Sequence, residues 1–199
     1  MPRRMVNRQM EKELKKPLLN LPNSLTLARL VSIPVVLICL TFPDRMGSFL
    51  AALFFTLASL TDILDGFFAR KYGTVTALGK LLDPLVDKLL VSLTMIMLIP
   101  LGRIPVWMVI LIIAREIALT GLRGIAAGEG IVIQASRLGK YKTLLQSFAL
   151  VGLCLHYPYF GVNIHVVGTV FLWGALILTL WSGWDYFRRF YSLFVPGRS

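Results

Sequence analysis

Long apolar blocks alternate with short polar segments along the 199 residues of this chain. Spanning a bilayer as a helix takes about 20 apolar residues, and the blocks approach or reach that length. They are continuously apolar, whereas strands of a membrane barrel would alternate between apolar and polar positions. We therefore predict an all-α integral membrane protein with six transmembrane helices, at about Leu25–Phe42, Ser48–Arg70, Leu78–Ile99, Ile104–Ala127, Thr143–Leu155 (or from near Ser136) and Val162–Trp184.

The first 20 residues are polar and basic, with apolar side chains at roughly helical intervals, at Met5, Met10, Leu14 and Leu18. This spacing favours an amphipathic helix on the membrane surface, and a disordered basic tail is the alternative. No apolar stretch precedes Pro22, so we expect no cleavable signal. We predict three parts, namely a surface segment at 1–20, a transmembrane catalytic domain at 21–190 and a tail at 191–199, with Pro22–Ser24 capping the first span.

Charge sets the expected orientation of the spans. Only 16% of the residues are charged, yet the net charge is +11. In so apolar a chain the excess of Lys and Arg indicates basic loops beside anionic lipid rather than nucleic-acid binding. One set of predicted helix ends holds nearly all the cations, and the opposite set holds only Arg45 and Arg103. Both termini are therefore predicted to be cytoplasmic, in a multi-pass protein of the bacterial-type inner membrane.

Several residue types are set aside as unlikely to carry chemistry. Cys39 and Cys154 fall inside apolar blocks without metal-ligand spacing. His156 and His165 flank the turn on the far side of the membrane and are interpreted as packing or interfacial residues. Aromatic residues near the C-terminus are interpreted as an interfacial belt, comprising Trp173, Trp181, Trp184, Tyr186, Phe187, Phe190 and Tyr191.

Four aspartates interrupt the second and third predicted spans, at Asp62, Asp65, Asp83 and Asp87. A carboxylate at bilayer depth costs roughly 2.5–3.5 kcal/mol, so four together need a positive partner. Steps of three and four residues place each pair on one stripe of its helix. Carboxylate oxygens suit Mg²⁺ or Mn²⁺ rather than zinc, and four of them can hold two ions in a two-metal site. The nearby glycines could clear space for a ligand, although small residues also simply let membrane helices pack.

The spacing D-x₂-D-G-x₂-A-R-x₈-G-x₃-D-x₃-D is complete between Asp62 and Asp87. It resembles the signature of the CDP-alcohol phosphotransferases, membrane enzymes that make phospholipids. By this resemblance Asp62, Asp65 and Asp83 bind the metals, with Asp87 as a further ligand, and Asp87 is the base that deprotonates the acceptor alcohol. The alternative that Asp87 is mainly a metal ligand stays open. The resemblance assigns six residues to the CDP site, namely Gly66, Ala69, Arg70, Gly79, Asn23 and Thr26.

A second informative stretch runs from Ala114 to Gln146 and carries cations inside and just after an apolar block. Positive-inside topology explains some of them, but Arg115 lies within the block itself. The patterns R-E-I-x₄-L-R and A-S-x-L-G-K-x-K-T-x₂-Q resemble family members whose acceptor is glycerol 3-phosphate and whose lipid donor is CDP-diacylglycerol. We assign the acceptor phosphate to Arg115, Arg123, Lys140 and Lys142, and expect Glu116 to pair with a cation.

These resemblances imply transfer of a phosphatidyl group from CDP-diacylglycerol to glycerol 3-phosphate, with release of CMP at the cytoplasmic side. The expected partners are those two substrates, membrane lipids and a second copy of the chain in a homodimer. One alternative keeps the chemistry with another acceptor, such as inositol phosphate. Another is a divalent-cation transporter, because intramembrane aspartates also mark ion pathways. Transport predicts polar groups near the bilayer midplane, whereas here the carboxylates gather at one end of the spans.

Overall fold

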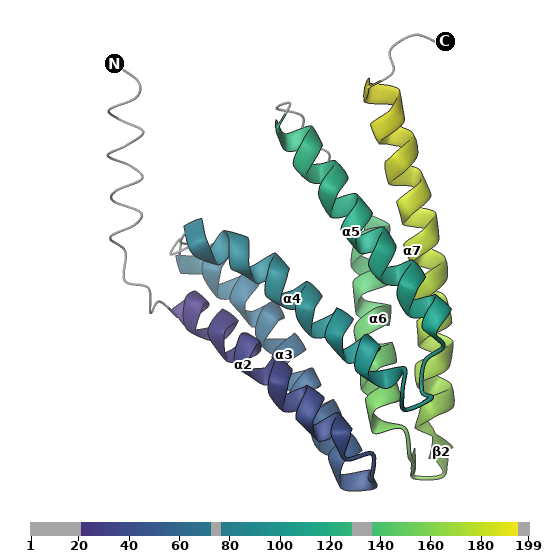
Figure 1. The fold of residues 1–199 in the computed structure, drawn as a ribbon. Coiled ribbons are helices and arrows are strands. Elements are labelled where there is room, and N and C mark those ends of the chain that lie inside the picture. Colours follow the sequence, from purple (N-terminus) through teal and green to yellow (C-terminus); the bar gives the residue numbers. More distant parts are fainter. Residues whose placement is uncertain (1–20, 73–76, 129–136, 195–199) are drawn as a thin grey trace. The chain divides into compact units, whose positions relative to one another are not determined.

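The computed structural model describes residues 21–72, 77–128 and 137–194. Within these ranges, side chains are described except at 21–25, 62–72, 77–81, 137–138, 140, 189 and 192–194. The described residues form six α-helices and one small β-hairpin, so the predicted helical class is confirmed (Figure 1). The chain divides into two compact units after Thr94, within helix α4.

Unit 1 contains α2 (Leu21–Thr41), α3 (Arg45–Tyr72) and most of α4 (Ala77–Leu98). Helices α2 and α3 pack against each other as an antiparallel pair (Figure 1). The pair buries apolar side chains from both helices, among them Val36, Leu40, Ala51 and Phe55. For helices in a bilayer, close van der Waals packing of such side chains stabilises the pair, because lipid is as apolar as the side chains.

The turn between α2 and α3 is built around Asp44 and Gly47. The Asp44 carboxylate accepts hydrogen bonds from the backbone amides of Met46 (3.3 Å) and Gly47 (3.2 Å), as an N-cap residue does. A Cβ on Gly47 would lie 2.1 Å from the carbonyl oxygen of Phe42, so any larger residue would force the turn open. The start of α3 is therefore determined by the Asp44 cap and by the close backbone approach at Gly47.

Unit 2 contains the end of α4, then α5 (Val106–Gly128), α6 (Arg137–Leu155) and α7 (Ile164–Phe194). The closest approach in the unit is between α6 and α7, at Gly152 and Gly168. A Cβ on Gly152 would lie 2.8 Å from the Cα of Gly168, so the two backbones touch. Small residues allow this kind of contact between apolar helices, and it holds α6 and α7 as a tight antiparallel pair.

A short hairpin joins α6 to α7, with β1 (Pro158–Tyr159) pairing antiparallel to β2 (Val162–Asn163). Its two turn residues, Phe160 and Gly161, have φ values of 50° and 77°. Positive φ at both central residues is what a two-residue hairpin turn requires. The predicted turn at this place is confirmed, with added strand pairing.

The observed helix ends differ from the predicted ones at α2 and α7, and α6 decides between two predicted starts. The described helix α2 starts at Leu21 and includes Pro22–Ser24, so the prediction that these residues form a cap before the helix is wrong. Helix α6 begins at Arg137, which agrees with the earlier of the two predicted starts. Helix α7 continues past Trp184 to Phe194, so aromatic residues predicted as an end are helical.

The membrane character of the helices is visible only in part. Within the described residues, Ile164–Arg188 alone is long and apolar enough to cross a bilayer by length and composition. Other apolar stretches are shorter, at Thr26–Thr41, Arg45–Thr61 and Tyr141–Leu155. The number of spans and the side on which the termini lie stay predictions. The segment 1–20 and the residues after 194 lie outside the described part of the chain.

Candidate functional site

The aspartates lie on two helices of unit 1, with Asp62 and Asp65 on α3 and Asp83 and Asp87 on α4. For the α3 pair the structure describes the backbone, which is helical, and not the side chains. The same holds for six further predicted residues, so their contacts stay predictions: Gly66, Ala69, Arg70, Gly79, Asn23 and Lys140. The predicted placement of the aspartates on helices is confirmed.

Asp83 and Asp87 are half-buried and lie one helical turn apart on α4. The hydroxyl of Thr26, on α2, donates a hydrogen bond to the Oδ1 atom of Asp83. Thr26 itself is buried. From the sequence, Thr26 was predicted to belong to the CDP site. In the structure it contacts Asp83, a predicted metal ligand. Helix α2 therefore helps to orient a carboxylate of the aspartate segment.

Arg29, also on α2, is a residue that the sequence interpretation missed. It is fully buried, and its Nε atom lies 3.3 Å from the carbonyl oxygen of Ala58 on α3. In an α-helix that carbonyl also accepts the amide of the residue four positions later, which here is Asp62. Arg29 therefore packs beside the turn of α3 that leads into the aspartates. A cation inside an apolar block was the signal that could have identified it.

The donor set of the aspartate segment is compatible with a divalent metal ion. Asp83 and Asp87 offer carboxylate oxygens on one helix face, and no His or Cys is part of the motif. Oxygen-only donors fit Mg²⁺ or Mn²⁺. Among the side chains that are described, no group of three or more His, Cys, Asp or Glu lies together. The other two predicted ligands, Asp62 and Asp65, are outside that set.

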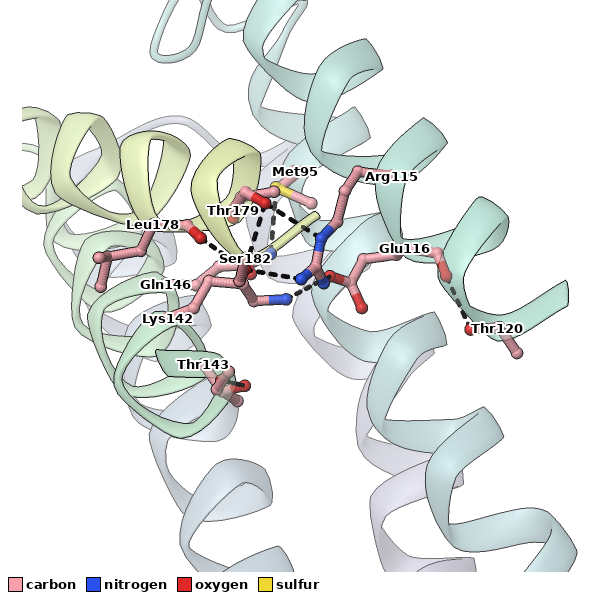
Figure 2. Close-up of polar contacts among 11 residues, drawn as sticks. Met95, Arg115, Glu116, Thr120, Lys142, Thr143, Gln146, Leu178, Thr179 and Ser182 are labelled. Carbon is pink, nitrogen blue, oxygen red and sulfur yellow. Dashed lines mark hydrogen bonds and ion pairs between the residues drawn. The ribbon is translucent and has the colours of Figure 1, made fainter. Parts of the chain in front are cut away.

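Unit 2 brings Arg115, Glu116 and Lys142 together in what we call the cation cluster (Figure 2). One carboxylate oxygen of Glu116, Oε1, accepts from Arg115 Nη1 at 2.8 Å and from Lys142 Nζ. The side chains are 14%, 22% and 7% exposed for Arg115, Glu116 and Lys142. The expected pairing of Glu116 with a cation is confirmed. A single carboxylate thus bridges two cations from different helices, α5 and α6.

Arg115 is also held against α7. Its Nε atom donates to the carbonyl oxygen of Thr179 at 3.1 Å, and Nη2 donates to Ser182 Oγ at 2.7 Å (Figure 2). Gly183 makes room, since a Cβ there would lie 3.2 Å from Arg115 Cγ. Because each of its three nitrogens donates a hydrogen bond, the guanidinium has a fixed orientation.

Arg123, two turns along α5 from Arg115, has a different neighbour. Its guanidinium carbon lies 5.4 Å from the ring centre of Tyr186 on α7, at cation–π distance. Eight residues along a helix correspond to about 12 Å, so Arg115 and Arg123 contact α7 at two separate levels. The structure therefore brings together Arg115 and Lys142 of the four residues assigned to the acceptor phosphate, with Arg123 further along.

Tyr186, which the sequence analysis assigned to an interfacial aromatic belt, is buried within unit 2. Tyr186 is 6% exposed, whereas Trp181 and Trp184 are 68% and 71% exposed. Thr179, Ser182 and Tyr186 follow each other at steps of three and four residues, so they lie on one face of α7. We call these three residues the hydroxyl stripe. The hydroxyl stripe faces Arg115 and Arg123 of α5. This contact depends on the packing of α5 against α7 and could not be predicted from the pattern of either helix alone.

His156 and His165 lie at the opposite end of α6 and α7. Their Nδ1 atoms are 3.2 Å apart, and the guanidinium of Arg103 donates to the carbonyl oxygens of Leu153 and Cys154 nearby. Burial, and then the nearby charges of Arg103 and His165, lower the pKa of His156. The contact between the two rings at the hairpin end of α6 and α7 agrees with the packing or interfacial role predicted for these histidines.

Comparison with known proteins identifies the protein family to which the chain belongs. The profile of the CDP-alcohol phosphatidyltransferase family matches residues 19–181, and the chain belongs to that family. It is therefore an enzyme, a phosphatidyltransferase of phospholipid biosynthesis. The family match covers both the aspartate segment and the cation cluster.

Individual relatives are similar along most of the chain. A CDP-diacylglycerol–glycerol-3-phosphate 3-phosphatidyltransferase of Bacillus subtilis (strain 168) is 43% identical over 85% of this chain and 94% of the relative. A protein of the same name from Rickettsia felis is 42% identical with the same coverage. A probable phosphatidylglycerophosphate synthase of Mycobacterium tuberculosis (strain ATCC 25618 / H37Rv) is 40% identical over 85% of this chain and 81% of the relative.

Proposed function

We propose that this protein transfers the phosphatidyl group of CDP-diacylglycerol to sn-glycerol 3-phosphate, giving phosphatidylglycerol phosphate and CMP. The observation that carries the proposal is the similarity, at 43% identity, to a relative named for that reaction and matched over 94% of its length. The family signature at Asp62–Asp87 and the buried cation cluster of unit 2 support it independently.

The aspartate segment is proposed to bind the CDP-diacylglycerol and a divalent metal, Mg²⁺ or Mn²⁺, with two ions as the expected stoichiometry. Asp62, Asp65 and Asp83 hold the metal, with Asp87 contributing. When bound, the metal supplies positive charge against the pyrophosphate and the departing CMP. Thr26 orients Asp83 through its hydroxyl, and Gly66, Ala69, Arg70, Gly79 and Asn23 bind the CDP group.

Asp87 is proposed to act as the general base. The acceptor alcohol is a weak nucleophile until its proton leaves, and a carboxylate at hydrogen-bond distance can take that proton as the oxygen attacks phosphorus. Asp87 lies one turn beyond Asp83 on the same face of α4, so it can serve the reaction without leaving its helix. The free primary hydroxyl of sn-glycerol 3-phosphate, at C1, is the expected nucleophile; its oxygen forms the new bond to phosphorus as the bond to CMP breaks, and its proton moves to the Asp87 carboxylate.

The cation cluster is proposed to select the phosphorylated acceptor. Arg115 and Lys142 carry two positive charges with limited exposure, and Glu116 removes one of them, so the cluster has a net charge of about +1. Arg123 and Lys140 add charge on the same two helices. Such a group of donors attracts a phosphate dianion and discriminates against an alcohol without one. An unphosphorylated alcohol would leave the remaining positive charge of the cluster uncompensated.

We further propose six transmembrane helices, both termini and the active site on the cytoplasmic side of the inner membrane, and a homodimer. Every described helix exposes large apolar side chains, for example Ile38, Leu57, Leu85, Ile117, Phe148 and Ile177 on α2 to α7. Exposed apolar faces on all helices suit a lipid environment better than water. Cysteine accessibility at helix ends in intact and in opened cells tests the orientation.

The decisive test of function is CMP release by the purified protein with CDP-diacylglycerol and Mg²⁺. Glycerol 3-phosphate, inositol phosphate, serine and water are compared as acceptors. We expect turnover with glycerol 3-phosphate only, loss of turnover with a chelator and recovery with Mg²⁺ or Mn²⁺. Preferred turnover with inositol phosphate would replace the acceptor and keep the chemistry. No CMP from any acceptor, with metal bound and the protein folded, would contradict the proposal as a whole.

A further inference from the structure

The hydroxyl stripe of α7 contains polar atoms that the fold itself does not satisfy. The side-chain oxygens of Thr179 and Tyr186 are buried and have no hydrogen-bond partner among the residues that the structure describes. Thr179 is completely buried and Tyr186 is 94% buried. Buried hydroxyls without a partner are uncommon in native proteins, because each costs free energy of desolvation. Such an atom calls for a physical explanation.

The surroundings of Tyr186 indicate what its partner is. One turn earlier on the same face of α7, Ser182 holds the guanidinium of Arg115. Above the Tyr186 ring lies the guanidinium of Arg123. The ring of Tyr186 therefore lies beside the Arg123 guanidinium, one helical turn from the serine that holds Arg115, so positive charge is close to it. An anion is the ligand that such an environment attracts, and a phenol O–H can donate a hydrogen bond to it.

We infer that Tyr186 binds the phosphate of the acceptor directly, through a hydrogen bond from its hydroxyl. The side chain of Arg123 is exposed and long, so it can move from the ring to the phosphate and open the way to the phenol oxygen. Helix α7 then supplies the third wall of the acceptor site, beside Arg115 and Arg123 of α5 and Lys142 of α6. This assignment rests on the proposed function of the cation cluster.

The test is the variant Tyr186→Phe, which removes the hydroxyl and keeps the ring on which Arg123 stacks. The expected result is a rise of about tenfold or more in KM for glycerol 3-phosphate, with KM for CDP-diacylglycerol unchanged. Tyr191→Phe, the same substitution at an exposed position of α7, is the matched control and should leave both constants unchanged. An unchanged KM for glycerol 3-phosphate in Tyr186→Phe would overturn the inference and assign the hydroxyl to a bound water.

Thermal unfolding of the metal-loaded protein separates a ligand role from a structural one. Removing an unsatisfied buried hydroxyl should leave the melting temperature of the ligand-free protein unchanged or higher. The increase in melting temperature caused by added inorganic phosphate should become smaller in Tyr186→Phe and not in Tyr191→Phe. A lower melting temperature of the ligand-free variant, with the phosphate effect intact, would show instead that the hydroxyl serves the fold.

The same measurements distinguish the failure of this inference from failure of the proposed function. If the wild-type protein neither turns over glycerol 3-phosphate nor is stabilised by phosphate, the acceptor site itself is wrongly assigned. If the wild type responds to both and Tyr186→Phe responds equally, only the role of Tyr186 is wrong.

Discussion

The aspartate segment of unit 1 and the cation cluster of unit 2 are built in different ways. The aspartates come from two consecutive helices joined by a short connection, and their order along the chain is itself the motif. The cation cluster joins α5, α6 and α7, and Arg115 bonds residues 64 and 67 positions away. One site is local in sequence and the other is assembled by tertiary packing.

The difference between a local site and an assembled site suggests a division of function between the two units. In the proposed function the local motif carries the metal ligands and the general base, and the assembled cluster binds the acceptor phosphate. Changes in unit 1 should therefore act on turnover, and changes in unit 2 on the affinity for the acceptor.

The largest effect is expected for Asp87→Asn. Loss of the general base should lower kcat for CMP release by about 10²–10⁴-fold, with little change in KM for glycerol 3-phosphate. Asp44→Asn is the matched control in the same unit, because asparagine caps a helix as well as aspartate does. If Asp87→Asn keeps its turnover, Asp87 is not the base. If that variant also needs a higher metal concentration for half-maximal activity, Asp87 is a metal ligand alone.

The next effect concerns the packing on which unit 2 depends. In Gly168→Ala the new Cβ would lie 2.8 Å from the amide nitrogen of Leu153, so α6 and α7 must separate. A loss of about 1–3 kcal/mol in unfolding free energy is expected, measured by denaturation in detergent. Gly174→Ala, whose Cβ would meet only Leu145 Cδ1 at 3.5 Å, should be nearly neutral. Equal stability of the two variants would contradict the described contact between α6 and α7.

A smaller and more selective effect is expected for Glu116→Gln. If Glu116 positions Arg115 and Lys142, the variant should raise KM for glycerol 3-phosphate roughly tenfold. If Glu116 only reduces the positive charge, the variant should bind the phosphate more tightly, so the sign of the change decides. Thr120→Ala is the control, since its hydroxyl bonds the backbone oxygen of Glu116 and not the carboxylate (Figure 2).

The smallest effect is expected for Thr26→Val, which removes the hydrogen bond to Asp83 without removing a carboxylate. The concentration of Mg²⁺ or Mn²⁺ needed for half-maximal activity should rise roughly fivefold. Thr41→Val serves as the control, because that hydroxyl is exposed and donates to the backbone oxygen of Ile38. A change in KM for glycerol 3-phosphate with no change in metal dependence would break the proposed division between the units.

The same contrast explains what could be predicted from the sequence. The helices, the hairpin turn and the helical placement of all four aspartates follow from hydrophobic pattern and spacing, which are local signals. Arg115 and Glu116 were identifiable because charges inside an apolar block need a partner. Their position in the sequence, however, contains no information about which distant helix supplies that partner.

The positions of three residues could not be predicted from the sequence, because they depend on tertiary packing. Tyr186 belongs to an aromatic-rich stretch, and only the packing of α7 separates this buried phenol from its exposed neighbours. Ser182 is a small polar residue in an apolar helix, a common occurrence without functional meaning. Arg29 follows Asn23 and Thr26, which were assigned to the CDP site, and no role was assigned to Arg29 itself. Its contact with Ala58 depends on how α2 packs against α3.

The contacts of Arg115 also bear on how the protein is synthesised. Its partners on α7 are made 64 and 67 residues later, which at about 5–20 residues per second is a delay of roughly 3–13 s. During that time the neighbouring carboxylate of Glu116 is already present to neutralise the charge. We expect Glu116→Gln to lower the yield of inserted protein in a pulse-chase experiment, before any substrate is bound. The residue next to Arg115 would then act first as a temporary counter-ion during membrane insertion, and only later as part of a binding site.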